Sequence, residues 1–350
     1  MPSLDFAQNP FIVIWETTRA CQLACRHCRA SAIRQRNSEE LTLEEVTHLV
    51  IEQLTTMGHP LFVMTGGDPM ERGDLVNIVY RARQAGLRPS ITPSATPKVT
   101  FDVMRDLKEA GLENWAFSLD GASAEIHDRF RGVQGTFDLT MEKIGYLHQL
   151  GIPLQINTTV SQYNVKNLSD LAKLVGSLEV FRWSVFFLIP TGRARLEDLL
   201  SPAEHEHVLQ WLFALQKTVP FDIKITEGPQ YHRIVAQNFE NDRKPSERLR
   251  SPLPVWDGHG FLFISHTGDV YPSGFLPVKV GNVRKTPLVE IYQQSPIMRS
   301  LRNPDGFKGK CGYCEFNKVC AGSRARAYAV TGDYLESDPF CPYIPDPRHR

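Results

Sequence analysis

Short runs of β-branched and aromatic residues alternate with amphipathic helical stretches from residue 11 to about residue 190. Parallel strands that are joined by helices produce this alternation in α/β proteins. We expect six strands, at residues 11–17, 60–65, 88–93, 115–119, 154–160 and 182–189. The helices before four of these strands end at a glycine, which readily adopts the left-handed conformation of a helix C-terminus. These glycines are Gly58, Gly86, Gly111 and Gly151.

Two helix beginnings have a complete capping signal. Thr42 and Ser201 are each followed by a glutamate three residues later, and Pro202 stands at the first helical position. Six βα units with right-handed crossovers form either an open doubly wound sheet or a partial barrel. In both folds the ligands bind at the carboxyl ends of the strands.

Charge and hydropathy exclude two classes of partner. The 350 residues contain 39 Lys and Arg and 39 Asp and Glu, so there is no excess positive charge for a nucleic-acid backbone. The most apolar runs, at residues 11–15 and 185–189, are far shorter than the roughly 20 residues of a membrane-spanning helix. The first residues also lack the basic start and apolar stretch of a secretory signal. We therefore expect a cytoplasmic protein that binds neither nucleic acid nor membrane.

All seven cysteines fall into two clusters, at positions 21, 25 and 28 and at positions 311, 314, 320 and 341. In a reducing compartment such clusters indicate metal ligation before disulfides. The first cluster directly follows the first expected strand. Three thiolates can hold three irons of a [4Fe–4S] cluster and leave the fourth iron open, whereas they form an incomplete zinc site. The four thiolates of the second cluster suit either a [4Fe–4S] cluster or zinc.

The spacing Cys21-x3-Cys25-x2-Cys28, with the aromatic His27 before the last cysteine, resembles the radical S-adenosylmethionine (SAM) superfamily. The resemblance implies a partial (β/α)6 barrel of the TIM type, with SAM chelated to the open iron. One electron then cleaves SAM to a 5′-deoxyadenosyl radical, which abstracts a hydrogen atom from the substrate. It also implies an electron donor such as flavodoxin or ferredoxin.

Further residues match the SAM-binding positions of this superfamily. Gly66, Gly67 and Asp68 resemble the family's Gly-Gly-Glu-Pro turn, with aspartate in place of glutamate. Arg131 resembles an arginine near the SAM carboxylate. Polar residues near the ends of three expected strands are further candidates for SAM contacts: Ser94, Ser118, Asp120 and Asn157.

The second cluster of cysteines resembles the C-terminal SPASM domain of radical SAM enzymes, in a reduced form. Ser273 and Ser323 stand where the fuller motif has cysteine. The resemblance implies one auxiliary [4Fe–4S] cluster, with zinc as the alternative, and we assign it to Cys311, Cys314, Cys320 and Cys341. We expect a barrel at residues 1–195, a helix and linker or lid at 196–255, and a small α+β SPASM-like domain at 256–350. Residues 220–256 lose the helix and strand periodicity, and 241–252 are expected to form the linker or lid.

Three C-terminal stretches, at residues 264–275, 281–283 and 323–333, are similar to radical SAM enzymes of the alternative haem and haem d1 pathways. This similarity implies a tetrapyrrole substrate whose carboxylate side chains are modified. Six arginines are candidates for carboxylate binding: Arg193, Arg195, Arg299, Arg302, Arg324 and Arg326. The main alternative is a peptide maturase that forms thioether or carbon–carbon crosslinks, although only ten residues precede the first expected strand. A non-catalytic iron–sulfur electron carrier is the third possibility.

Overall fold

The computed structural model describes residues 5–239 and 255–346. The linker or lid expected at residues 241–252 lies outside the described residues. The strands are β1 (Ile12–Glu16), β2 (Leu61–Thr65), β3 (Arg88–Ile91), β4 (Asn114–Ser118), β5 (Leu154–Val160), β6 (Arg182–Phe187), β7 (Asp222–Thr226), β8 (Phe261–Ile264), β9 (Asp269–Tyr271) and β10 (Gly281–Asn282).

Helices and short helical turns connect these strands. The longer helices are α3 (Leu75–Gln84), α4 (Phe101–Glu109), α5 (Ala124–Arg131), α6 (Thr136–Leu150), α7 (Leu168–Ser177), α8 (Pro202–Gln216), α9 (Gln230–Phe239) and α14 (Arg324–Thr331). The shorter ones are α1 (Leu43–Val46), α2 (Glu52–Thr55), α10 (Leu288–Gln294), α11 (Pro296–Leu301), α12 (Gly309–Gly312) and α13 (Asn317–Cys320). A π-helical turn, Thr47–Ile51, joins α1 to α2.

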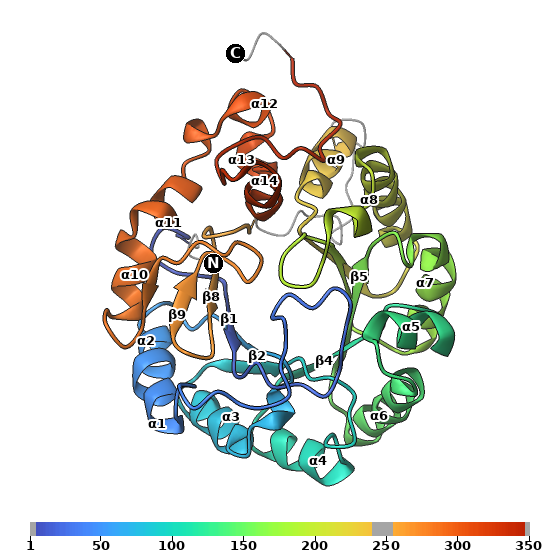
Figure 1. Ribbon diagram of the computed structural model, residues 1–350, viewed down its shortest axis with the longest axis vertical. Coiled ribbons are helices and arrows are strands. Elements are labelled where there is room, and N and C mark those ends of the chain that lie inside the picture. The colour runs from blue at the N-terminus through green and yellow to red at the C-terminus, as the bar shows by residue number, and fades with distance from the viewer. Residues whose placement is uncertain (1–4, 240–254, 347–350) are drawn as a thin grey trace.

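The order of the strands identifies the fold as a partial barrel. Strands β1 to β6 lie side by side in sequence order and pair in parallel. A doubly wound sheet would reverse its strand order at a switch point, and this sheet does not. The helices that connect these strands lie around the outside of the sheet (Figure 1). All six expected strands are confirmed, with ends that differ by two residues or fewer from the expected ones.

The sheet extends beyond the six expected strands at both edges. β7 pairs in parallel with β6. β8 pairs in parallel with β1, although more than 240 residues separate the two strands in the sequence. The antiparallel strands β9 and β10 complete the edge beside β8. The expected loss of periodicity from residue 220 is therefore wrong for β7 and α9, which form a seventh βα unit.

The capping signals are confirmed. Thr42 and Ser201 each form a capping box with the glutamate three residues later, and Pro202 begins α8. Gly58, Gly86, Gly111 and Gly151 have φ values between +62° and +99°. No helix among the described residues is long and apolar enough to cross a membrane.

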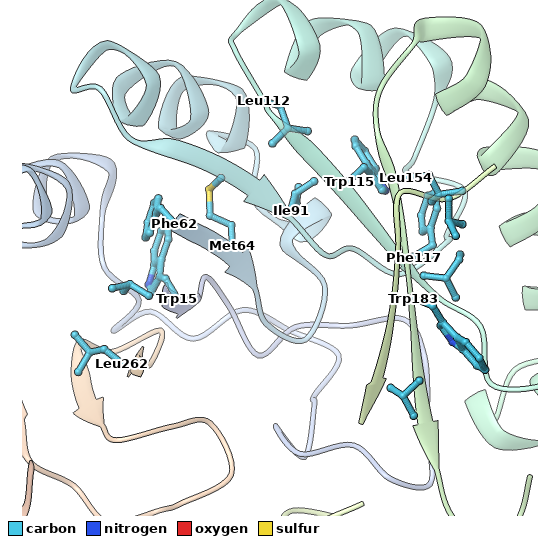
Figure 2. Packing of buried hydrophobic residues seen from close by; sticks show 14 of the residues in the cluster. Trp15, Phe62, Met64, Ile91, Leu112, Trp115, Phe117, Leu154, Trp183 and Leu262 are labelled. Atoms are coloured by element: carbon cyan, nitrogen blue, oxygen red, sulfur yellow. The ribbon is translucent and has the colours of Figure 1, made fainter. Parts of the chain in front are cut away.

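The side chains of each barrel strand alternate between two environments. Outward side chains such as Trp15, Phe62, Trp115 and Trp183 are buried between the sheet and the helices (Figure 2). The rings of Trp15 and Phe62 are stacked with an interplanar angle of 7°. The inward side chains of the same strands line a cavity. The barrel therefore has its apolar core outside the sheet and leaves its interior available for ligands.

Candidate active site

A cavity of about 280 Å³ occupies the inside of the barrel and is lined by residues from each of the strands β1 to β8. Most of the expected site residues lie together on its wall. These are Cys21, Cys25, His27, Cys28, Gly66, Gly67, Ser94, Ser118, Arg131 and Asn157. Asp68 and Asp120 do not line the cavity, and both are fully buried behind it.

The three cysteines of the first cluster lie on the loop after β1, and close backbone contacts hold this loop from three sides. A Cβ atom on Gly67 would lie 2.3 Å from the carbonyl oxygen of Ala20. A Cβ on Gly132 would lie 2.5 Å from the Ala24 carbonyl oxygen, and one on Gly192 would lie 2.3 Å from that of Cys28. The glycine at position 67 is thus required by the packing of the β2 turn against the cysteine loop.

The three thiols point into the same cavity and are held by weak hydrogen bonds. Cys21 Sγ accepts from the backbone N–H of Leu23 at 3.3 Å and lies 3.7 Å from Ser94 Oγ. Cys28 Sγ accepts from the N–H of Ala32 at 3.4 Å. Burial raises the pKa of the Cys21 thiol to about 11, so a bound metal is needed to make it a thiolate at neutral pH. Three soft sulfur donors around one cavity fit an iron–sulfur cluster.

Arg131, the last residue of α5, contacts the cysteine loop at Cys25. Its guanidinium forms an ion pair with Asp120 and donates to Cys25 Sγ at 3.8 Å. Asp120 also accepts from the N–H of Thr159 at 2.7 Å. Asp120 therefore contributes to the site by positioning Arg131.

The side chains of His27 and Asp68 contact other residues of the protein and hold the loops around the site in place. The His27 ring stacks on Phe130 at 4.2 Å, and burial lowers its pKa well below the usual value, so the ring is neutral. The Asp68 carboxylate accepts from the N–H groups of Met70 at 3.1 Å and Ser94 at 3.4 Å. It thereby ties the β2 turn to the loop after β3, and only the backbone of this turn lines the cavity, at Gly66 and Gly67.

The second group of cysteines lines a separate small pocket between α9 and the C-terminal segment. Cys311, Cys314, Cys320 and Cys341 all contribute to its wall. Arg324 donates to Cys311 Sγ at 3.6 Å. Within the described ranges, no three histidine, cysteine or carboxylate side chains are grouped to bind a single metal ion. A [4Fe–4S] cluster gives each thiolate its own iron, and four thiols around one pocket fit such a cluster.

The two serines that replace cysteines of the fuller motif belong to a buried polar network. Ser323 Oγ donates to Glu227 Oε2 at 2.5 Å, and Ser273 hydrogen bonds to Asp257. Burial raises the pKa of Glu227 to about 8. Each of the two serines is therefore hydrogen-bonded to a carboxyl group.

Five cationic side chains line the barrel cavity, and among the described residues no aspartate or glutamate lines it. They are Arg29, Arg131, Arg182, Arg193 and Lys224. Of the six arginines expected to bind carboxylates, Arg193 alone lies on this wall, and its Nε and Nη2 atoms are buried without a hydrogen-bond partner in the described part of the chain. Sequence reasoning did not select Arg29, Arg182 or Lys224.

The other five candidate arginines have different roles. Arg195 pairs with Glu197 at the surface, and Arg299 donates to the carbonyl oxygen of Gln293. Arg302 binds backbone carbonyl oxygens, one of them that of Gly258. Arg324 and Arg326 are buried beside the second group of cysteines and bind groups of the chain itself.

Comparison with known proteins agrees with the fold and with both groups of cysteines. Residues 15–175 match the radical SAM superfamily, and residues 256–320 match SPASM, an iron–sulfur cluster-binding domain. The chain belongs to the radical SAM superfamily and is an enzyme with an iron–sulfur SPASM domain. Its cofactors are SAM, the SAM-binding [4Fe–4S] cluster and one auxiliary [4Fe–4S] cluster.

Individual relatives cover nearly the whole chain. The AdoMet-dependent heme synthase of Methanosarcina barkeri (strain Fusaro / DSM 804) is 40% identical over 96% of this chain and 97% of its own length. A PqqA peptide cyclase of Rhizobium meliloti (strain 1021) is 27% identical over 95% of this chain and 87% of its own. The structure of Streptococcus suis SuiB bound to S-adenosylmethionine has the same fold, with a TM-score of 0.73 and 15% identity over 96% of this chain and 78% of that chain.

Proposed function

We propose that Cys21, Cys25 and Cys28 hold the [4Fe–4S] cluster at which SAM is cleaved. When bound, this cluster and SAM supply a 5′-deoxyadenosyl radical, which abstracts a hydrogen atom from the substrate. The proposal is supported by the convergence of the three thiols on one cavity. The remaining four, Cys311, Cys314, Cys320 and Cys341, are assigned to the auxiliary cluster.

The residues around the first cluster bind and orient SAM. The backbone of Gly66 and Gly67 receives its amino group, and Arg131, positioned by Asp120, lies near its carboxylate. His27 acts as a neutral stacking residue under the loop. Ser94, Ser118 and Asn157 offer hydrogen bonds from the wall of the cavity to the remaining polar groups of SAM. Asp68 acts on SAM indirectly, since it orders the Gly66–Gly67 turn.

The substrate in this proposal is a tetrapyrrole with several carboxylate side chains, which the enzyme modifies in haem-type biosynthesis. The observation that carries the proposal is the cavity wall, which has five cations and no carboxylate among the described residues. Three of these cations are paired with Glu16, Asp120 and Asp222, which lie outside the lining. Arg193 and Lys224 have no ion-pair partner within the described part of the chain and are the cations available to a substrate. Arginine binds carboxylates through two parallel hydrogen bonds, and the free nitrogens of Arg193 suit this arrangement. The 40% identity to an AdoMet-dependent heme synthase supports the same substrate class.

Reductive cleavage of SAM requires an external electron. We assign this role to a small electron carrier of the flavodoxin or ferredoxin type. A cytosolic location fits the chain, because metal ligation by its two groups of cysteines requires reduced thiols.

The test is an anaerobic assay of 5′-deoxyadenosine with reconstituted enzyme, SAM and dithionite. We expect stimulation by iron coproporphyrin III, which has four carboxylates, and none by its tetramethyl ester, which has the same ring without the charges. Stimulation by both compounds, or by neither, contradicts a carboxylate substrate. A peptide substrate is the second candidate, favoured by the 27% identity to a PqqA peptide cyclase. A response to a precursor peptide with none to the porphyrin would establish it.

A further inference from the structure

The inner wall of the barrel has a row of polar side chains across four neighbouring strands. Ser118 on β4 pairs in register with Asn157 on β5, which pairs with Ser184 on β6, which pairs with Lys224 on β7. All four line the cavity. Barrel interiors are usually filled by bulky apolar side chains, so a polar row with a lysine at its end indicates a ligand-binding surface.

Lys224 is the unusual member of this row. It lies in the interior of a strand, between Ile223 and Ile225, and its side chain is half-buried on the cavity wall. No hydrogen bond or ion pair of its ammonium group is found within residues 5–239 and 255–346. Partial loss of hydration without a partner is already costly for an ammonium group, so such a group is retained where an anion binds.

A second positive charge near Lys224 makes the binding of an anion there more favourable. Arg182, one strand away on β6, also lines the cavity, and its own partner Asp222 is 3.5 Å away and mostly exposed. Desolvation and the charge of Arg182 lower the pKa of Lys224 to about 8. An anion between the two side chains would relieve both effects.

We infer that Lys224 is a binding residue for one carboxylate of the substrate, with Arg182 beside it. This inference rests on the proposed function and adds a second anchor to Arg193. Arg193 follows β6, beside Cys28, and its backbone N–H donates to the Cys28 carbonyl oxygen at 3.0 Å. Lys224 lies inside β7, the strand after β6. A substrate with several carboxylates can therefore be held at two places, which fixes its orientation toward the cysteine loop.

The inference is tested by the absorbance titration of reconstituted holoenzyme with iron coproporphyrin III. Lys224→Met keeps the length of the side chain and removes the charge, and we expect its Kd to rise at least about tenfold. Lys224→Gln should show a similar loss, whereas Lys224→Arg should stay within about threefold of the unsubstituted enzyme. Lys173→Met, which removes an exposed lysine of α7, is the matched control and should bind normally. Iron content equal to that of the unsubstituted enzyme shows that each variant is folded.

Two other outcomes separate the inference from the proposed function. If the unsubstituted enzyme binds the porphyrin and both Lys224→Met and Lys224→Gln bind it equally well, the inference is overturned and the proposed function stands. If the unsubstituted enzyme does not bind the porphyrin, the proposed function fails, and the inference fails with it. The tetramethyl ester provides the charge control, because its affinity should not depend on Lys224.

Discussion

Asp120 holds Arg131 in a buried ion pair, and the same guanidinium donates to Cys25 Sγ at 3.8 Å. A carboxylate that lies outside the cavity is thus connected through one arginine to a proposed cluster ligand. The arrangement places a positive charge beside the thiol group that is expected to bind iron.

We expect Asp120→Asn to lower the free energy of unfolding by about 3–5 kcal/mol, because removal of one partner leaves the Arg131 charge buried and uncompensated. Anaerobic urea unfolding measures this change. Asp170→Asn removes the exposed partner of Lys173 and should change stability by less than about 1 kcal/mol. Similar small effects of both substitutions would show that Asp120 does not stabilise Arg131.

The close contact of Gly192 with the cysteine loop predicts a local defect. Gly192→Ala places a methyl group 2.3 Å from the Cys28 carbonyl oxygen, so the loop must shift and SAM cleavage should fall at least about tenfold. Gly176→Ala, in α7, meets no atom within 4 Å and serves as the control, with unchanged cleavage. The measurement is 5′-deoxyadenosine formation after reconstitution. Normal cleavage by Gly192→Ala would mean that the contact is not needed.

The charge of Lys224 predicts how porphyrin binding depends on pH. Its pKa in the free enzyme is about 8, and only the protonated ammonium form attracts a carboxylate. Affinity should therefore be constant below about pH 7 and fall above pH 8, by up to about tenfold per pH unit. The other cations facing the cavity are Arg29, Arg131, Arg182 and Arg193, which stay charged throughout this range. Titrations from pH 6.5 to about 9.5 measure the effect, and Lys224→Met should abolish the decrease.

The two groups of cysteines predict about eight irons per chain, four in each cluster. Replacing Cys311 and Cys320 together by alanine leaves only two thiolates in the second group, too few for a cluster, so iron should fall to about four per chain while SAM cleavage without substrate persists. Metal analysis together with the 5′-deoxyadenosine assay measures both. About four irons and one zinc in the unsubstituted enzyme would contradict the second [4Fe–4S] cluster.

Much of the fold could be predicted because local patterns and tertiary structure agree. The βα units are marked by glycines at helix ends and by the helix caps at Thr42 and Ser201. These signals, together with the apolar runs between them, predict the six strands. The five residues of β7 alternate polar and apolar side chains, which is a strand signal, but the run is short and was not distinguished from a loop. β8 forms by pairing with the distant β1, which no local pattern reveals.

The cysteines of the candidate site were predicted by their spacing, and the roles of charged residues were harder to predict. Spacing along the chain does not show that Asp68 and Asp120 are buried and do not line the cavity, since burial behind a loop depends on tertiary packing. Spacing also does not show that Arg193 lines the cavity whereas the other five candidate arginines bind groups elsewhere in the protein. Lys224 had a usable signal, because a lysine between two isoleucines of a strand faces opposite to both.

We propose that the enzyme modifies carboxylate side chains of a tetrapyrrole by SAM radical chemistry. Abstraction of a hydrogen atom from a propionate side chain, followed by loss of its carboxyl group as CO₂ and of one electron to an external acceptor, would leave a vinyl group. The most direct test is the release of labelled CO₂ from iron coproporphyrin III labelled in its propionate carboxyl groups, measured with 5′-deoxyadenosine in the same anaerobic reaction with an electron acceptor present. We expect about one CO₂ for each 5′-deoxyadenosine formed in the presence of the porphyrin, because each radical abstracts one hydrogen atom. Formation of 5′-deoxyadenosine without labelled CO₂, and with the porphyrin recovered unchanged, would contradict it.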